Sequence, residues 1–199
     1  MLNLPNLLSL CRILLVPPLV VVLLTRFEGK EWWGLALFLL AALMDFLDGF
    51  LARRRKQVTR LGTLLDPAAD KILMSAAFIS LVEMQQAEAW MVVVIIAREF
   101  AVSALRSFAA AEHLVVPAAL SGKIKTVVQI IAVASLIIHE KLPGELQHLS
   151  IISLWAAVLI SVYSGAEYFV RFGPLILHGE RAAAPSSSVQ TPGPPRGDV

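Results

Sequence analysis

Six apolar runs alternate with short polar stretches along this chain of 199 residues; all but the short fifth run are close to the length that crosses a bilayer. A membrane-spanning helix needs roughly 20 mostly apolar residues. The runs cover residues 7–24, 32–51, 66–84, 90–110, 124–138 and 149–170. Of all residues, 57% are hydrophobic and 16% are charged, against about 45–50% and 25% in soluble domains. The sequence therefore predicts an all-α integral membrane bundle of six transmembrane helices.

The two ends of the chain differ in character. The N-terminus lacks a basic leader and a small-residue cleavage site, so the first apolar run is expected to be a retained span. Residues 181–199 are rich in Ser, Pro and Gly and show no apolar pattern, a composition typical of disorder. We therefore expect one transmembrane catalytic domain over residues 1–180 and a disordered tail over residues 181–199.

Basic residues gather in the segments that follow the second and the fourth apolar run. They are Arg53, Arg54, Arg55, Lys56 and Arg60 in the first segment, and Lys123 and Lys125 in the second. Basic loops stay in the cytoplasm, so both termini are predicted to be cytoplasmic. The net charge of +2 is too small to indicate a nucleic-acid partner. Most of the first basic segment is therefore interpreted as a determinant of topology and a contact for anionic lipids.

Four aspartates flank the first basic segment. Asp45 and Asp48 are three residues apart, and Asp66 and Asp70 are four apart, so each pair shares one helix face. Carboxylates near the end of a membrane helix are costly unless they meet a cation, a partner or water. Because hard oxygen ligands suit Mg²⁺, Ca²⁺ or Mn²⁺, the aspartates predict a divalent-metal site on the cytoplasmic side. The alternative is carboxylates that pair with arginines or relay protons.

Small residues and an arginine lie between the two aspartate pairs. Gly49 and Ala52 keep a helix face open for a bulky planar group, and Gly62 is expected to close the loop before the third helix. Arg53 is a fork-shaped donor for phosphate. Metal ions beside a phosphate-binding arginine indicate phosphoryl-type transfer.

The spacing of these residues, D-x2-D-G-x2-A-R-x8-G-x3-D-x3-D, resembles the signature of the CDP-alcohol phosphatidyltransferase family at every fixed position. The resemblance implies a six-helix membrane enzyme, usually a homodimer, that displaces CMP from a CDP-activated lipid. It implies that Asp45, Asp48 and Asp66 bind a divalent metal, and that Asp70 is the proton acceptor and a further metal ligand. The implied contacts with the CDP moiety are Gly49, Ala52, Arg53, Thr59 and Gly62.

Three further segments, LPNLLSLCRILLVPPLV, IIAREFAVSALRSFAA and SGKIKTVVQ, resemble the phosphatidylglycerophosphate synthase branch of this family. That resemblance covers about residues 3–172. It implies CDP-diacylglycerol as donor, glycerol 3-phosphate as acceptor, and Mg²⁺ or Mn²⁺ as cofactor. It also implies a multi-pass protein of the bacterial inner membrane whose active site faces the cytoplasm. The cations expected to bind the acceptor phosphate are Arg98, Arg106, Lys123 and Lys125.

Alternatives remain open at this point. The acceptor could instead be serine or inositol phosphate. A small ion-coupled transporter is a further alternative, although its charges should lie near the bilayer midplane on broken helices. Arg98 and Glu99, adjacent inside an apolar run, suit a structural ion pair as well as a substrate contact. Lys123 and Lys125 could set topology instead of binding phosphate.

Overall fold

The computed structural model describes residues 4–55, 60–111 and 120–182, and within these residues every regular element is a helix. The elements are α1 (Leu4–Leu24), α2 (Lys30–Arg55), α3 (Arg60–Glu83), α4 (Ala89–Ala111), α5 (Leu120–Ile137), a 3-10 turn η1 (His139–Lys141) and α6 (Gly144–Ala182). Each predicted apolar run corresponds to one α-helix, which confirms the all-α prediction. The predicted tail begins at the last turn of α6, and residues 183–199 lie outside the described residues.

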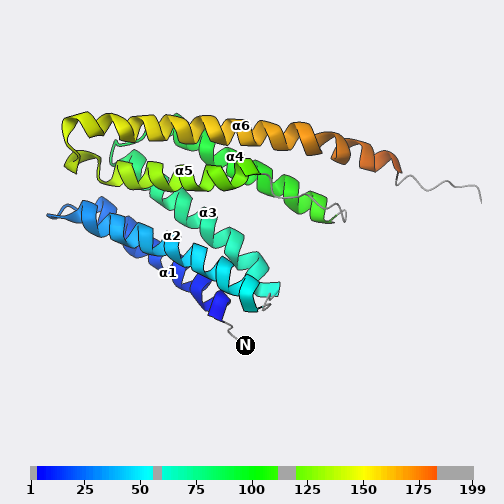
Figure 1. Cartoon of the computed structure of the whole chain (residues 1–199), viewed down its shortest axis with the longest axis horizontal. Coiled ribbons are helices and arrows are strands. Elements are labelled where there is room, and N and C mark those ends of the chain that lie inside the picture. The colour runs from blue at the N-terminus through cyan, green and yellow to red at the C-terminus, as the bar shows by residue number, and fades with distance from the viewer. Residues whose placement is uncertain (1–3, 56–59, 112–119, 183–199) are drawn as a thin grey trace, which may run out of the picture.

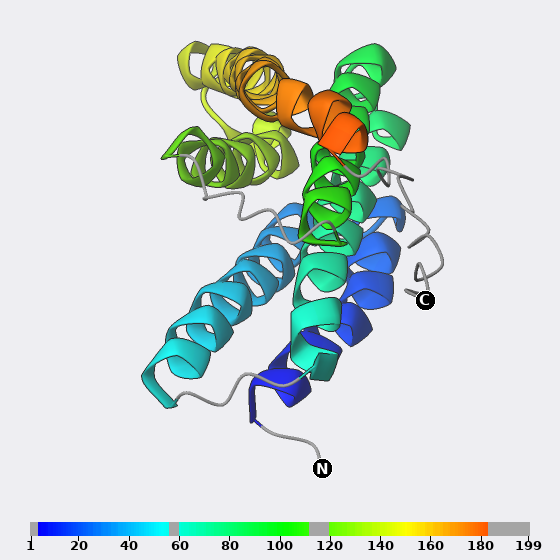
Figure 2. The same cartoon turned by 90° about the vertical axis from the view of Figure 1, so that its right-hand side faces the viewer.

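The helices form two groups of three along the chain (Figure 1). α1 packs against α2 and α3, and α6 packs against α4 and α5. The groups meet where α3 contacts α4 and α5, and where α2 contacts α5. The turned view in Figure 2 shows α4 running close to α3. Side chains at the junction of α3, α4 and α5 can therefore act together although they are distant in sequence.

One apolar core runs through both groups. Its largest fully buried side chains include Leu19, Leu23, Phe38, Phe78, Leu81, Ile95, Leu136 and Ile137. Many outward positions are apolar as well: Leu14, Val93 and Leu159 are each more than half exposed. A helix that is apolar on all sides suits a membrane or the interior of a larger protein.

The helices differ in how well they qualify as membrane spans. Among the described residues, Leu7–Leu24 in α1 and Gly144–Val170 in α6 are long and apolar enough to cross a membrane, and Ile124–Ile137 is a shorter apolar helix. The other three α-helices carry charges within their apolar sequence, such as Asp45 in α2, Asp70 in α3 and Arg98 in α4. These charges are the residues from which the candidate site is built.

The third helix begins earlier than the sequence predicts, at Arg60 instead of near Asp66. Pro67 consequently lies well inside α3, and Gly62 lies within the helix instead of closing a loop before it. An internal proline removes one backbone hydrogen bond, but neighbouring groups make this tolerable in membrane helices. The leucines that precede Asp66 allow the helix to continue towards the basic segment.

Candidate active site

Asp45 on α2 forms an ion pair with Arg12 on α1. The Arg12 Nη1 atom donates a hydrogen bond to Asp45 Oδ1 over 2.5 Å. The Arg12 side chain is fully buried, whereas the Asp45 side chain is 39% exposed. An arginine inside an apolar helix is costly unless it meets an acid or a polar cavity. The pair therefore joins α1 to α2 and orients one of the aspartates predicted to bind metal.

Asp70 on α3 lies between charged groups from both halves of the fold. Asp45 and Arg12 act on it electrostatically from one side, and Lys125 and Glu99 from the other. The charges of the Asp45 and Asp70 carboxylates thus repel each other. Oxygen donors of like charge on two neighbouring helices fit a hard divalent cation, which would offset that repulsion.

The other two predicted metal ligands lie on the same two helices. Asp48 belongs to α2 and Asp66 to α3, and these helices are in contact. The side chains of Asp48 and Asp66 are not among those that the structure describes. Among the side chains that it does describe, no three His, Cys, Asp or Glu residues form a group suited to a metal ion.

Four of the five residues predicted to contact the CDP moiety lie near the end of α2 or the start of α3. Gly49, Ala52 and Arg53 lie in the last turns of α2, and Gly62 lies in the first turn of α3. Thr59 falls outside the described residues. The roles of these five residues stay predictions from the sequence.

A pocket of about 220 Å³ is lined by residues of α3, α4, α5 and α6. It brings Asp70 together with Arg98, Arg106 and Lys125, which are three of the four cations predicted to bind the acceptor phosphate. The fourth, Lys123, lies on α5, but its side chain is not described. A single water needs about 10–15 Å³, so this pocket has room for a small organic anion beside the carboxylate.

Glu99 holds the cations of this pocket in place. Its Oε1 atom accepts hydrogen bonds from Lys125 Nζ, from Gln129 Nε2 at 3.2 Å and from Arg98 Nη1 at 3.4 Å. Lys125 and Gln129 are buried, and a buried lysine needs such a partner. The ion pair that the sequence left open therefore forms, yet Arg98 and Lys125 still line the pocket.

Helix α6 holds the side chain of Arg98 at the wall of the pocket. The Arg98 Nη2 atom donates to Ser164 Oγ at 2.5 Å, and Gln129 Nε2 donates to Ser161 Oγ at 3.3 Å. A Cβ atom at Gly165 would lie 3.0 Å from Arg98 Cγ, so the glycine leaves room for the arginine stem. These contacts fix the guanidinium at the pocket wall.

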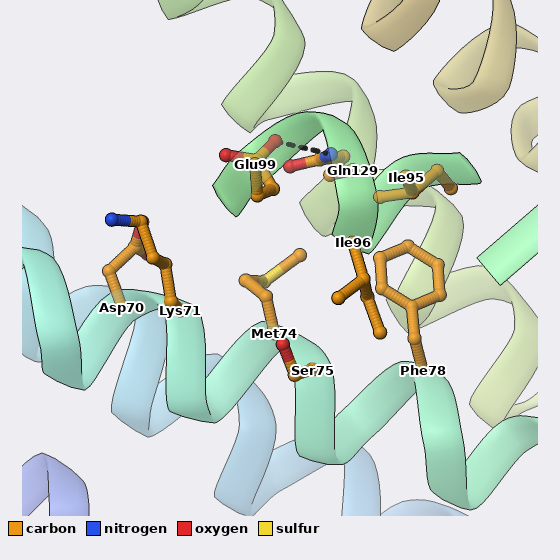
Figure 3. Close-up of a pocket in the computed structure, with 9 residues that line it drawn as sticks. All are labelled: Asp70, Lys71, Met74, Ser75, Phe78, Ile95, Ile96, Glu99 and Gln129. Atoms are coloured by element: carbon orange, nitrogen blue, oxygen red, sulfur yellow. Dashed lines mark hydrogen bonds between the residues drawn. The ribbon is translucent and has the colours of Figure 1, made fainter. Parts of the chain in front are cut away.

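A narrow crevice between α3 and α4 shares Asp70, Lys71 and Glu99 with the pocket (Figure 3). Asp70 and Lys71 lie at one end of it, Glu99 and Gln129 lie across from α3, and the rest of the lining is mainly apolar: Met74, Phe78, Ile95 and Ile96. The apolar side chains pack α3 against α4. They therefore fix the separation between Asp70 and Glu99.

Sequence reasoning missed Arg12 as a member of the site. Its signal was an arginine inside the first apolar run, because a charge in a membrane segment indicates a buried partner or a functional site. The sequence could not identify the residue that pairs with Arg12, since Asp45 is 33 positions away along the chain.

Replacing Arg12 with methionine should destabilise the protein by roughly 1.5–3 kcal/mol, the usual range for a hydrogen bond between charged groups. The full cost of breaking a buried ion pair is not expected, because Asp45 is partly exposed. Thermal unfolding in detergent would measure the change. The double variant Arg12→Met with Asp45→Asn should recover part of the loss, because it removes the unpaired carboxylate. Equal destabilisation in the single and double variants would contradict the pairing.

Comparisons with known proteins point to one family. The sequence model of the CDP-alcohol phosphatidyltransferase family matches residues 2–163. A CDP-diacylglycerol–glycerol-3-phosphate 3-phosphatidyltransferase of Bacillus subtilis (strain 168) is 46% identical over 183 residues, covering 85% of this chain and 94% of the relative. A protein of the same name from Salmonella choleraesuis (strain SC-B67) is 36% identical, covering 83% and 92%. A probable phosphatidylglycerophosphate synthase of Mycobacterium tuberculosis (strain CDC 1551 / Oshkosh) is 35% identical, covering 85% and 81%.

Proposed function

The chain belongs to the CDP-alcohol phosphatidyltransferase family, and from that membership we propose that it transfers the phosphatidyl group of CDP-diacylglycerol to glycerol 3-phosphate. The products are phosphatidylglycerophosphate and CMP. The structural observation that carries this proposal is a pocket in which Asp70 meets Arg98, Arg106 and Lys125. An acceptor with a phosphate at one end and a reactive hydroxyl at the other needs that combination of groups.

The acceptor phosphate binds against the three cations, whose charge offsets its own. Its primary hydroxyl then points towards Asp70 in the same pocket. Asp70 takes the hydroxyl proton while the oxygen attacks the lipid-side phosphorus of the donor. The new P–O bond replaces the bond between that phosphorus and the CMP oxygen, which leaves with the bonding electrons. Holding both reactants in this geometry contributes much of the rate.

The proposed cofactor is Mg²⁺ or Mn²⁺, held by Asp45, Asp48, Asp66 and Asp70. When bound, a divalent ion neutralises the donor pyrophosphate and stabilises the charge that develops at phosphorus. The electrostatic repulsion between Asp45 and Asp70 supports this assignment, because a divalent ion would offset it. Arg12 keeps Asp45 oriented, while Gly49, Ala52, Arg53, Thr59 and Gly62 are the proposed contacts of the CDP moiety.

The proposed setting is the inner membrane, with six spans and with the site at its cytoplasmic face. Two helices long and apolar enough to cross a membrane support it, as does the concentration of basic residues near α2, α3 and α5. The diacylglycerol chains stay in lipid while the pyrophosphate reaches the aspartates. A homodimer is part of the same proposal and follows from the family resemblance.

Competition between acceptors tests the proposed reaction. Purified protein supplied with CDP-diacylglycerol should release CMP at least about tenfold faster with glycerol 3-phosphate than with serine or inositol, since each of these lacks the phosphate and its charged hydrogen bonds. Inositol phosphate is the more demanding comparison, because it keeps the phosphate but has a larger ring. Preference for another acceptor would overturn the assigned substrate. No CMP release with any acceptor would overturn the transferase itself and leave a transporter to be tested.

A further inference from the structure

We propose that Glu99 accepts a hydrogen bond from the secondary hydroxyl of the acceptor and so selects a glycerol phosphate over a phosphate that lacks this hydroxyl. The inference rests on the proposed function and assigns a specificity role within the same pocket. It concerns a residue for which the sequence left open a structural ion pair with Arg98 or a substrate contact.

The two oxygens of the Glu99 carboxylate have different surroundings. Oε1 accepts all three hydrogen bonds that the structure gives this side chain, from Lys125, Gln129 and Arg98. Within the described residues, Oε2 receives none of these bonds. The side chain is 18% exposed and lines the pocket. The three donors therefore fix the carboxylate in one orientation, and its second oxygen remains available to a ligand.

A carboxylate that lines a pocket for a phosphate is unfavourable unless it has a role of its own. Its charge repels the incoming anion, so Glu99 weakens binding unless it contributes an attraction of its own. Part of that contribution is to hold Arg98 and Lys125. A hydroxyl donor on the acceptor would supply the rest, because a charged acceptor forms stronger hydrogen bonds than a neutral one. Without such a donor, the bound acceptor would shield this carboxylate oxygen from water and leave it without a hydrogen bond, which costs free energy.

The position of Glu99 matches the order of groups in the acceptor. Glu99 is bonded to Arg98 and Lys125, which are proposed to bind the phosphate. It also acts electrostatically on Asp70, and both residues line the pocket and the crevice (Figure 3). In glycerol 3-phosphate the secondary hydroxyl lies between the phosphate and the primary hydroxyl. Glu99 lines the same pocket as the cations and the proposed base, so an acceptor that reaches from the cations to Asp70 lies in the pocket beside Glu99.

Two acceptors and one variant test the inference. Glycerol 3-phosphate and 3-hydroxypropyl phosphate share the phosphate and the primary hydroxyl, but only the first has the secondary hydroxyl. The wild type should prefer glycerol 3-phosphate in kcat/KM by about 10- to 100-fold, the value of one charged hydrogen bond. In Glu99→Gln this preference should fall by about tenfold. If turnover of the variant is too slow to measure, calorimetric affinities for the two acceptors test whether the preference in binding falls in the same direction.

Ser164→Ala is the matched control, because Ser164 supports the guanidinium of Arg98 and both acceptors carry the phosphate. It should lower kcat/KM for the two acceptors equally and leave the preference unchanged. A wild-type preference that survives in Glu99→Gln, or an equal loss for both acceptors, would overturn the role of Glu99. Absence of transfer to glycerol 3-phosphate by the wild type would instead overturn the proposed function, so the two failures are distinct.

Discussion

Replacing Asp70 with asparagine is expected to lower the rate of CMP release by about 10²- to 10⁴-fold, the usual contribution of a positioned general base. Asparagine keeps the shape of the side chain but cannot take the hydroxyl proton. Asp70 is the described carboxylate that lines the pocket on the α3 side, and it faces the cations of α4 and α5. Steady-state CMP release and the affinity for CDP-diacylglycerol, measured on the same preparation, separate chemistry from donor binding.

Donor affinity should persist in part in Asp70→Asn, because Arg53 and the other aspartates remain. Glu83→Gln is the control: it makes the same change of acid to amide on the same helix, but Glu83 is the last residue of that helix and is exposed. It should leave CMP release near the wild-type value. Near-normal turnover in Asp70→Asn would remove Asp70 from the role of base and would require another proton acceptor in the pocket.

Much of the fold was predictable because it depends on local patterns. Runs of apolar residues predict where each helix lies, and all six runs correspond to helices in the structure. Arg98, Arg106, Lys123 and Lys125 were assigned to one site from the family resemblance, and their role in binding the acceptor phosphate stays a prediction. The structure brings Arg98, Arg106 and Lys125 to one pocket. The predicted start of α3 was wrong. Proline is favoured in the first turn of a helix, which suggested a start near Pro67, but α3 begins earlier and continues through this proline.

The contacts between distant segments were not predictable, because they depend on how the helices pack. The pairing of Arg12 with Asp45 requires α1 to lie against α2. The role of Glu99 requires α5 to bring Lys125 and Gln129 to α4. From the sequence, Glu99 has one evident partner, its neighbour Arg98. In the structure Glu99 accepts hydrogen bonds from two cationic donors and one amide donor and lines the pocket with them.

Removing divalent ions is expected to reduce CMP release by at least about a hundredfold, since a metal ion contributes several kcal/mol of charge stabilisation and each 1.36 kcal/mol corresponds to about tenfold in rate. Activity should return with Mg²⁺ or Mn²⁺ but not with a monovalent salt at equal ionic strength. A second measurement does not depend on activity: an ion that binds the folded protein also stabilises it, by about 2.7 kcal/mol at a concentration of 100 Kd.

Thermal unfolding with and without Mg²⁺ would therefore show whether the ion binds the protein, and the same measurement on variants would show which residues bind it. The wild type should gain several degrees, because about 2–4 °C accompany each kcal/mol in a protein of this size. Asp45→Asn should lose most of that gain, whereas Glu83→Gln, which alters an exposed acid away from the aspartates, should keep it. An equal gain in both variants would show that Mg²⁺ acts elsewhere on the protein. Full activity after chelation would mean that the repulsion between Asp45 and Asp70 is offset by Arg12 and Lys125 alone, without a divalent ion.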